Sequence, residues 1–581
     1  MQTSSPIADP LTILPPELVL RILEFASLST VTSLSAVSPA WRQFIDLTHQ
    51  DAIYSIFSKA AYRSGATFSK WFDDITACKK LCERQTLLAR NWASPQPISR
   101  ELVLQVSDSP VWRFRADLKR RFIISTSHAG GLNVTDIDTG QVIWRLPSTI
   151  NSPAEHAVRP YAHLEYDDGM AVFDREGDAV EVWQTDMEGT SRGEFRRIAV
   201  LDHDCQTRGF QLSYGTLCVV STQGQAFVYD MKQRPPTLVT HLTIQHDAVG
   251  HLDQSEDAVI YSMGARGYHA YDKRTGDFLG ALQPSHCTEI SHIRHPVVPP
   301  ALPSISPLET QPRNMPHQFL SAGPPTKNNI VPVILSKGPL PPPRDPTHVR
   351  HGEDEWGAGM ESDGLFVGIS RAGRVFVCSD WRKALRDEKS LSECSALIEC
   401  ESDGSTFDLG GWLSIRNRRL MFEVQDRAYV VVLDENNRIP DVDHPTSASY
   451  SFLTCSMPQL AVPVSFMALY DDVIMTTYTT LGRRQPPAIH PNGMAQDHQD
   501  NAAHFFPTKT VRILVMTPDQ PAVDSTEAGS LAGENVEGLE EHSSSADELR
   551  SRALFQLLSM LRDEYGDSDG NESDGGWEDI D

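Results

Sequence analysis

The first fifty residues carry apolar side chains at helical spacing. One stripe recurs at steps of three and four residues and consists of Leu18, Val19, Ile22, Leu23 and Ala26. This spacing places the apolar groups on one face of an α-helix. The helix is expected to begin at the two prolines that precede it, because the first turn of a helix tolerates a missing backbone N–H group.

Two more short helices are predicted before residue 48. Ser29 or Thr30 can cap the second helix, and Ser38 followed by Pro39 is typical of the start of a third. Helices this short are marginal alone. The segment also carries more large apolar groups than such a unit can bury, so part of this surface is expected to contact a partner.

Helical spacing continues from Gln50 to Trp92, and Ser69 can cap a helix within it. Cys78 and Cys82 lie four residues apart in this region, which would place two potential metal ligands on one helix face. No second ligand pair at metal-site spacing accompanies them, so we interpret them as ordinary helix residues. The region is therefore expected to be a helix packed under the domain that follows.

Beyond Pro97 the pattern changes from helical to strand spacing. An apolar run, a polar turn and a second apolar run recur, and the turn glycines Gly131, Gly177, Gly224 and Gly267 are spaced by 46, 47 and 43 residues. The next turn glycine, Gly373, follows after 106 residues. The intervening residues 284–346 hold 16 of the 39 prolines in the chain, and subtracting these 63 residues leaves a spacing of 43.

Repeats of about 40–50 residues with several short strands are typical of β-propeller blades. Five clear units and two weaker ones predict seven blades. Arg100–Val106 is expected to supply an extra strand that closes the ring and leaves no free edge. A different large all-β arrangement stays open as an alternative.

The patterns together predict a multidomain chain, with a small all-α part followed by an all-β, seven-bladed propeller. The proline-rich insertion is expected to be extended and mobile, because prolines interrupt both helices and sheets. The expected divisions are a disordered start at 1–11, a helical domain at 12–48, a helical linker at 49–98, the propeller at 99–517 with insertions near 284–346 and 483–509, and an acidic, mostly disordered tail at 518–581 with an amphipathic helix near 546–564.

Composition narrows the class of protein. The formal net charge of −26 argues against nucleic acid as the main partner, because phosphate binding needs a positive surface. The charge is uneven, since the tail from Pro518 onward holds 18 acidic residues against 3 arginines, a local charge of −15. Nine cysteines without framework spacing fit reduced thiols. With no secretory signal and no membrane-length apolar run, we expect a soluble chain of the cytoplasm or nucleus, without membrane insertion.

The first helical segment resembles the F-box. That family reads Leu-Pro-x-Glu-Leu, then Ile-Leu and, after a turn, Val-Ser-x-x-Trp-Arg. Two positions that are usually leucine are Ala26 and Val31 here, which departs from the family pattern. The matching residues, aligned without a gap, are Leu14-Pro15-Pro16-Glu17-Leu18, Ile22-Leu23 and Val37-Ser38-Pro39-Ala40-Trp41-Arg42.

The resemblance implies docking on the Skp-type adaptor of a cullin–RING ubiquitin ligase. The ending Arg90-Asn91-Trp92 and the strand repeats resemble the F-box/WD-repeat family, although the repeats are degenerate and lack its Gly-His dipeptide. The residues that the resemblance assigns to adaptor binding are Leu14, Pro15, Leu18, Ile22, Leu23, Val37 and Trp41.

Basic residues recur in the predicted blade turns. In a WD-type blade, the turn between the second and third strands opens on the face where peptide partners dock. Arginine holds phosphate or carboxylate groups with two parallel hydrogen bonds, so a ring of such residues could bind a target, and the resemblance implies a phosphorylated one. Solvated loop arginines are the alternative. The residues are His128, Arg175, Arg266, Arg371 and Arg427, with Arg374 placed either in a turn or at the start of the next strand.

No catalytic motif, metal ligand set or cofactor motif is present, so no catalytic residue, metal or cofactor is expected. Pro339–Arg344 fits either a polyproline ligand or a plain spacer. The acidic residues Asp563–Asp581 are hypothesised to compete for the arginine ring.

The predicted function is that of a substrate-recognition subunit of a Skp–cullin–F-box ubiquitin ligase, whose propeller binds a protein target. The chain itself is not expected to be an enzyme. Two alternatives are an F-box and propeller scaffold that acts outside a ligase, and a propeller enzyme.

Overall fold

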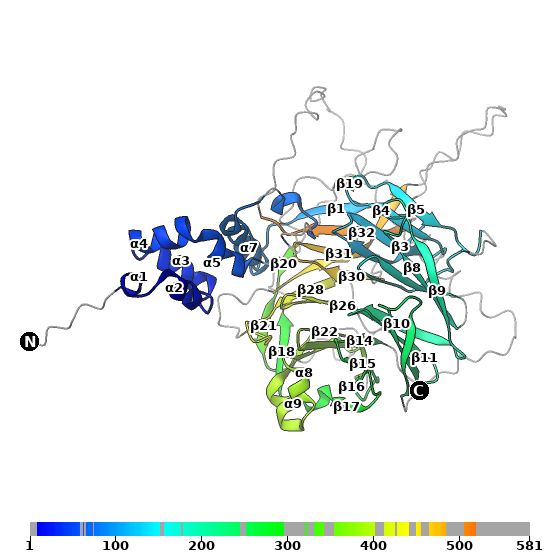
Figure 1. Ribbon diagram of the computed structural model, residues 1–581. Helices are drawn as coiled ribbons and strands as arrows, with labels where there is room; N and C mark the ends of the chain where they lie inside the picture. Colours follow the sequence, from blue (N-terminus) through cyan, green and yellow to red (C-terminus); the bar gives the residue numbers. More distant parts are fainter. Residues whose placement is uncertain are drawn as a thin grey trace, which may run out of the picture.

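The computed structural model of this chain describes residues 9–58, 62, 66–73, 75–107, 109–151, 156–175, 178–244, 251–294, 320–321, 330–341, 354–400, 412–424, 427–440, 449–454, 464–483 and 505–518. A group of helices projects from one side of a large body of strands (Figure 1). The expected division into an all-α part and an all-β part is thereby confirmed. The expected disorder at the start, the helix of the acidic tail and most of the second insertion lie outside the described residues.

Short helices form the amino-terminal part. The first group, called here the helical unit, comprises α1 (Pro10–Ile13), α2 (Pro16–Leu23), α3 (Leu28–Ser35), α4 (Pro39–Arg42), the π-helical turn η1 (Gln43–Thr48) and α5 (Gln50–Phe57). The helical linker comprises the 3-10 turn η2 (Lys70–Phe72) and α7 (Cys78–Trp92).

Serine side chains cap these helices. Ser38 accepts a hydrogen bond from the backbone N–H of Trp41, as expected for the start of α4. The predicted cap of the second helix was wrong. Ser27 caps α3 by accepting from the backbone N–H of Thr30, so the helix begins one turn earlier than the proposed caps Ser29 and Thr30 allow.

The helical unit has its own apolar core. Its buried members are Val19 and Leu23 of α2, Val31, Trp41, Ile45, Ile53 and Tyr54, together with Cys82 of the linker helix α7. The contact with Cys82 means that the core continues into the linker. The helical unit and the linker therefore pack as one body, which suits helices too short to be stable alone.

Seven sheets follow in the described part, and in each the four blade strands pair antiparallel in order from the inner strand outward. Blade 1 contains β2 (Val111–Asp117), β3 (Phe122–Ser127), β4 (Leu132–Asp136) and β5 (Val142–Leu146). Blade 2 contains β6 (Leu164–Asp167), β7 (Met170–Asp174), β8 (Ala179–Gln184) and β9 (Arg196–Asp202). Blade 3 contains β10 (Thr207–Ser213), β11 (Thr216–Ser221), β12 (Gln225–Asp230) and β13 (Thr237–Thr243), and blade 4 contains β14 (Leu252–Gln254), β15 (Ala258–Ser262), β16 (Tyr268–Asp272) and β17 (Phe278–Leu282).

The remaining three blades carry additional strands at their outer edges. Blade 5 contains β22 (Trp356–Ser362), β23 (Leu365–Ser370), β24 (Arg374–Cys378) and β25 (Ser395–Glu399), with α8 (Trp381–Ala384) and α9 (Glu388–Cys394) between its last two strands. Blade 6 contains β26 (Leu413–Arg416), β27 (Arg419–Val424), β28 (Arg427–Val432) and β29 (Ser449–Leu453). Blade 7 contains β30 (Met467–Leu469), β31 (Val473–Arg483), β32 (Phe505–Val515) and, as its fourth strand, β1 (Arg100–Leu104).

The strand β1 closes the ring as predicted. It pairs antiparallel with β32, so that Leu102 lies opposite Ile513, more than 400 residues later in the chain. The first strand of the propeller thus completes the last blade. Its pairing satisfies the edge of β32, which an open ring would leave exposed.

The expectation that the proline-rich insertion cannot form strands was wrong for its described parts. After the 3-10 turn η3 (Pro284–His286), β18 (Glu289–Arg294) adds to the outer edge of blade 5 parallel to β25, and β21 (Ile334–Lys337) adds to β18. Between them along the chain, β19 (Leu320–Ser321) pairs with β1, and β20 (Ile330–Pro332) pairs with β29. Proline is tolerated at sheet edges, and Pro332, the one proline of these four strands, lies in the edge strand β20.

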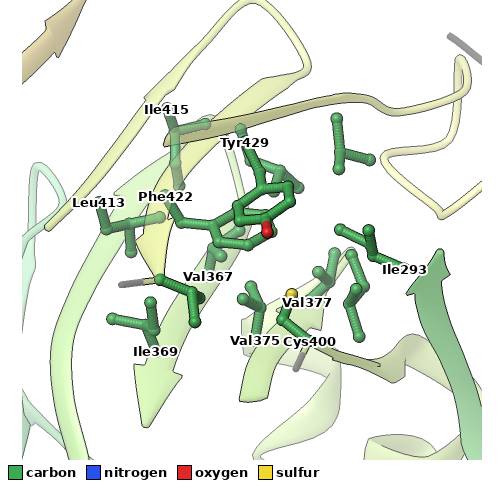
Figure 2. Packing of buried hydrophobic residues seen from close by; sticks show 14 of the residues in the cluster. Ile293, Val367, Ile369, Val375, Val377, Cys400, Leu413, Ile415, Phe422 and Tyr429 are labelled. Carbon is green, nitrogen blue, oxygen red and sulfur yellow. The ribbon is translucent and has the colours of Figure 1, made fainter. Parts of the chain in front are cut away.

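The core lies between neighbouring blades. All residues of the middle strands β3, β23 and β27 are buried, because blades cover both of their faces. Figure 2 shows the cluster between blades 5 and 6, where the stacked rings of Phe422 and Tyr429 have centroids 5.4 Å apart. Ile293 of β18 contributes to this cluster, so the insertion takes part in the core.

The helical linker is anchored to the turn between β30 and β31. Asp472 in this turn accepts hydrogen bonds from the backbone N–H groups of Phe68 and Ser69, at 3.0 and 2.7 Å. At the end of α7, the Asn91 side chain donates to the carbonyl of Met516 at 2.6 Å, and the Trp92 indole donates to the carbonyl of Asp471 at 3.1 Å. The linker and the propeller therefore share buried polar contacts and a common apolar cluster.

Substitution of Asp472 by alanine is expected to loosen this junction. It leaves the buried N–H of Phe68 without an acceptor, at a cost of about 1–3 kcal/mol, and the half-buried N–H of Ser69 at a smaller cost. Limited proteolysis should then cut residues 58–75 faster, and the thermal midpoint should fall. The control is Asp202→Ala at an exposed site on β9. Equal proteolysis rates for the two variants would contradict the assigned anchor.

Two glycines of the β15–β16 turn form a matched pair for a second test. Both have left-handed backbone conformations, with φ of +58° at Gly264 and +77° at Gly267. A Cβ atom at Gly267 would lie 2.3 Å from the carbonyl oxygen of Leu282, whereas one at Gly264 would meet nothing within 4 Å. Gly264→Ala should cost about 1–2 kcal/mol from strain alone. Gly267→Ala should lower the thermal midpoint at least twice as much, and the reverse order would refute this packing.

Candidate functional site

The helix α2 has two apolar faces, and only one of them is covered. Val19 and Leu23 point into the core and are each 2% exposed. Leu18 and Ile22, one turn apart, are 51% and 57% exposed, and Phe25 just beyond the helix is 84% exposed. Apolar side chains at this spacing form one continuous outward stripe. A contiguous stripe of this kind marks a surface for a protein partner.

A small cavity opens beside this helix. It has a volume of about 290 Å³ and is lined by Leu11, Leu14, Pro16, Val19, Ala40, Gln43, Phe44 and Thr48. Most of these groups are apolar, so the cavity suits an apolar side chain rather than a charged one.

The structure separates the predicted adaptor-binding residues into two groups. Pro15, Leu18, Ile22 and Val37 are exposed, and Leu14 is half-buried at the cavity. Leu23 and Trp41 are only 2% and 8% exposed and belong to the core of the helical unit, because each sits on the inward side of its helix. Adaptor binding by the seven predicted residues stays a prediction. Sequence reasoning missed Phe25, although its position seven residues after Leu18 was a signal.

The predicted basic turns lie on the face of the propeller opposite the linker. The linker contacts the turn between the first and second strands of blade 7, and Arg121 in the equivalent turn of blade 1 donates to the carbonyl groups of Thr67 and Phe68. The turns between second and third strands lie at the other ends of the same strands. We call this side the turn face.

Carboxylates accompany several of the predicted arginines. Arg371 forms an ion pair with Glu355 at 2.7 Å, and the guanidinium of Arg175 lies 4.0 Å from Glu181. Arg374 is the first residue of β24 and pairs with Glu399 at 3.1 Å and with Asp354. The expected positive ring is therefore partly neutralised.

Three other predicted side chains also lie on the turn face. Arg266 is exposed, and Arg427 donates to the hydroxyl of Ser451 at 3.4 Å. His128 lies against the rings of Trp112 and Tyr161, with centroid distances of 5.7 and 4.9 Å. A role of these residues in target binding stays a prediction.

A second group of side chains meets where the inner strands begin. The guanidinium of Arg113 lies 4.0 Å from the ring centroid of Trp412 and 5.6 Å from that of Phe466. Its terminal nitrogen is 3.5 Å from the ring nitrogen of His163. On the other side, His251 contacts Trp412, with ring centroids 6.4 Å apart.

These contacts cross the ring rather than follow it. Arg113 belongs to blade 1, Trp412 to blade 6, Phe466 to blade 7 and His251 to blade 4. His163 of blade 2 contacts Phe210 of blade 3, with ring centroids 4.6 Å apart. Side chains from six blades can meet only on the axis that the inner strands surround. We call this group, with Arg115 and Glu165, the axial cluster.

Burial governs the electrostatics of the axial cluster. It lowers the pKa of Arg113 to about 9, so this group stays protonated at neutral pH. Burial, reinforced by the charge of Arg113, lowers the pKa of both His163 and His251 to about 4, which leaves them neutral. For Glu165, burial acts to raise the pKa, but Arg115 and His163 outweigh it and hold the pKa at about 2.

No feature of the local sequence marked the axial cluster. Trp112 and Arg113 read as ordinary strand residues, and Trp412 lies almost 300 residues later. Among the described residues, no group of three or more His, Cys, Asp or Glu side chains is placed to hold a metal ion. Within that same part of the chain, the helices are too short or too polar to cross a membrane.

Comparison with known proteins gives a family match for the amino-terminal part of the chain. The F-box domain family matches residues 11–49. A comparison of the sequence with curated proteins found no match. Similar solved structures include Saccharomyces cerevisiae Sqt1, at 9% identity and a TM-score of 0.39 over 72% of this chain and 100% of that chain.

Two further structures are similar at the same level. The Cps50 (Swd1) β-propeller domain of Myceliophteria thermophila has 8% identity and a TM-score of 0.37 over 64% of this chain and 95% of that chain. The computationally designed Ika8 protein has 13% identity and a TM-score of 0.36 over 65% and 96%. The combination of an F-box and a propeller is typical of a non-catalytic adaptor or receptor. This chain therefore carries an F-box domain, matched over residues 11–49, ahead of a seven-bladed β-propeller.

Proposed function

We propose that this chain is the substrate-recognition subunit of a Skp–cullin–F-box ubiquitin ligase. The observation that carries the proposal is the outward apolar stripe on α2, which lies within the matched F-box and has no partner within the described part of the chain. F-box domains generally bind Skp-type adaptors, and propellers bind protein targets. In this reading the stripe docks on the adaptor, and the propeller holds the target.

The buried junction between linker and propeller supports separate binding roles for the α2 stripe and the propeller. Asp472, Asn91 and Trp92 fix the linker to the face opposite the turn face. A target on the turn face would then be held at a constant offset from the adaptor. Such tethering raises the local concentration of target near the catalytic subunits without any chemistry by this chain. We expect the protein to work in the cytoplasm or nucleus, and we regard its blades as degenerate WD repeats.

The double variant Leu18→Ala with Ile22→Ala tests the proposal. It removes exposed apolar groups and leaves the core residues Val19 and Leu23 in place. Each lost side chain should weaken the contact by about 1–2 kcal/mol, so co-purification of adaptor and cullin should fall at least tenfold. The matched control is Leu238→Ala with Val239→Ala, which removes two apolar groups, each 50% exposed, from the outer strand of blade 3.

The partners recovered with the unaltered chain decide between the two candidate functions. Recovery of both adaptor and cullin, lost in the α2 variant alone, supports the ligase subunit. Recovery of adaptor without cullin points to a scaffold that acts outside a ligase. Failure of a folded chain to bind the adaptor would rule out the docking role of the stripe.

A further inference from the structure

The axial cluster carries one positive charge more than its own residues neutralise. Arg115 donates to both oxygens of Glu165, at 2.6 Å each, and this carboxylate also lies 3.0 Å from a ring nitrogen of His163. Two guanidinium groups therefore face one carboxylate, and the neutral imidazoles add nothing. Counted over Arg113, Arg115 and Glu165 alone, the charge is two minus one, or +1, at a site mostly closed to water.

Arg113 holds this excess charge. Its residue is only 8% exposed, and its Nε atom has no hydrogen-bond partner among the described residues. Stacking on Trp412 and Phe466 offsets part of the lost hydration, as cation–π contacts do. Yet a buried charge normally has an oppositely charged partner, because removing an ion from water costs several kcal/mol. An anionic ligand would supply both the missing charge and the missing acceptor.

The surroundings determine which kind of anion fits. A net charge of +1 is matched by a carboxylate, whereas a phosphate monoester carries about −1.5 to −2 at neutral pH. The exposed pair Arg371–Glu355 on the same face is neutral and adds no positive charge to balance a second negative charge. Half-buried Trp112 and the 39% exposed Tyr161 lie near the end of the axis and offer aromatic faces to the flanking residues of a peptide.

We propose that the axial cluster binds the carboxylate of an aspartate or glutamate in an unphosphorylated, acidic peptide segment. This inference deepens the proposed function, since it names the chemistry of the segment that the propeller recognises, but it does not depend on adaptor binding. Two sources offer such a segment. One is a target protein, and the other is the tail of this chain, whose residues 563–581 hold nine acidic side chains and no lysine or arginine.

The tail is long enough to reach the site. Forty-five residues separate Pro518 from Asp563, which at about 3.3 Å per extended residue exceeds the span of a single domain. If the tail is the source of the bound carboxylate, it occupies the site until a target displaces it.

The test uses a fluorescein-labelled peptide of residues 563–581 and measures its binding to purified full-length protein and to a variant that lacks these residues. Arg113→Gln should weaken peptide binding to the shortened protein at least tenfold. Arg371→Gln, which removes an arginine that Glu355 already neutralises, should change the affinity less than threefold. Equal losses in both variants, or no binding at 100 μM peptide (a concentration of about 10⁻⁴ M, the range of weak complexes), would overturn the axial site.

A gain of affinity keeps the test decisive if Arg113→Gln does not fold. Glu165→Gln removes the only carboxylate within hydrogen-bond reach of Arg115 among the described residues and raises the net charge from +1 to +2. It should tighten binding of the acidic peptide about fivefold or more, an effect that a purely structural role cannot produce. Unchanged or weaker binding by a folded Glu165→Gln variant would contradict the charge balance.

Two comparisons settle the ligand class and its source. A peptide phosphorylated at Ser568 and Ser573 should bind no more than about threefold tighter than the plain one, and a tenfold gain that depends on Arg113 would overturn the carboxylate assignment. Binding at least tenfold tighter to the shortened protein than to the full chain identifies the tail as an occupant. Equal binding, still lost with Arg113→Gln, supports the site with the target as its source.

Discussion

The pairing of β1 with β32 joins the two ends of the propeller and holds the rest of the architecture in place. Because β1 follows directly after the linker helix α7, the same sheet that closes the ring also receives the linker. Asn91 bonds to the carbonyl of Met516, just beyond the end of β32. Ring closure and attachment of the F-box are thus one structural event, and the direction in which the helical unit projects follows from the position of blade 7 (Figure 1).

Closure also creates the axial cluster. Arg113 belongs to the first blade and Phe466 to the last, so their contact exists only when the ring is complete. The turn arginines and the axial cluster differ in how far carboxylates neutralise their positive charge. In the outer turns, Arg371 forms an exposed ion pair with Glu355, and such pairs contribute little to stability. At the axis a buried guanidinium lacks a full partner, and burial makes that imbalance far more costly than at the surface.

The proline-rich insertion has a second architectural effect. Its strands extend blades 5, 6 and 7, the same side of the ring that receives the linker. Ile330 of β20 packs in one cluster with Trp71 and Trp92 of the linker, and Ile293 of β18 enters the core between blades 5 and 6. A segment that interrupts the repeat in sequence therefore reinforces the junction in space, because the outer edges of blades accept any strand with free backbone groups.

Local pattern alone was enough to predict the helical unit, the seven blades and the closing strand, because each depends on spacing within a few residues or on a repeat. The F-box motif pointed to residues of the outward stripe on α2 for the same reason, although it could not tell the outward Ile22 from the inward Leu23. Only the tertiary structure decided which arginines are neutralised, which edges the insertion covers, and that Arg113 meets Trp412 and His163 at the axis. The contacts of Arg113 join residues 50 and 299 positions apart, and ring closure, which no local pattern encodes, brings them together. The ion pairs of the turn arginines are closer in sequence, but they depend on how each turn folds back beside its strands.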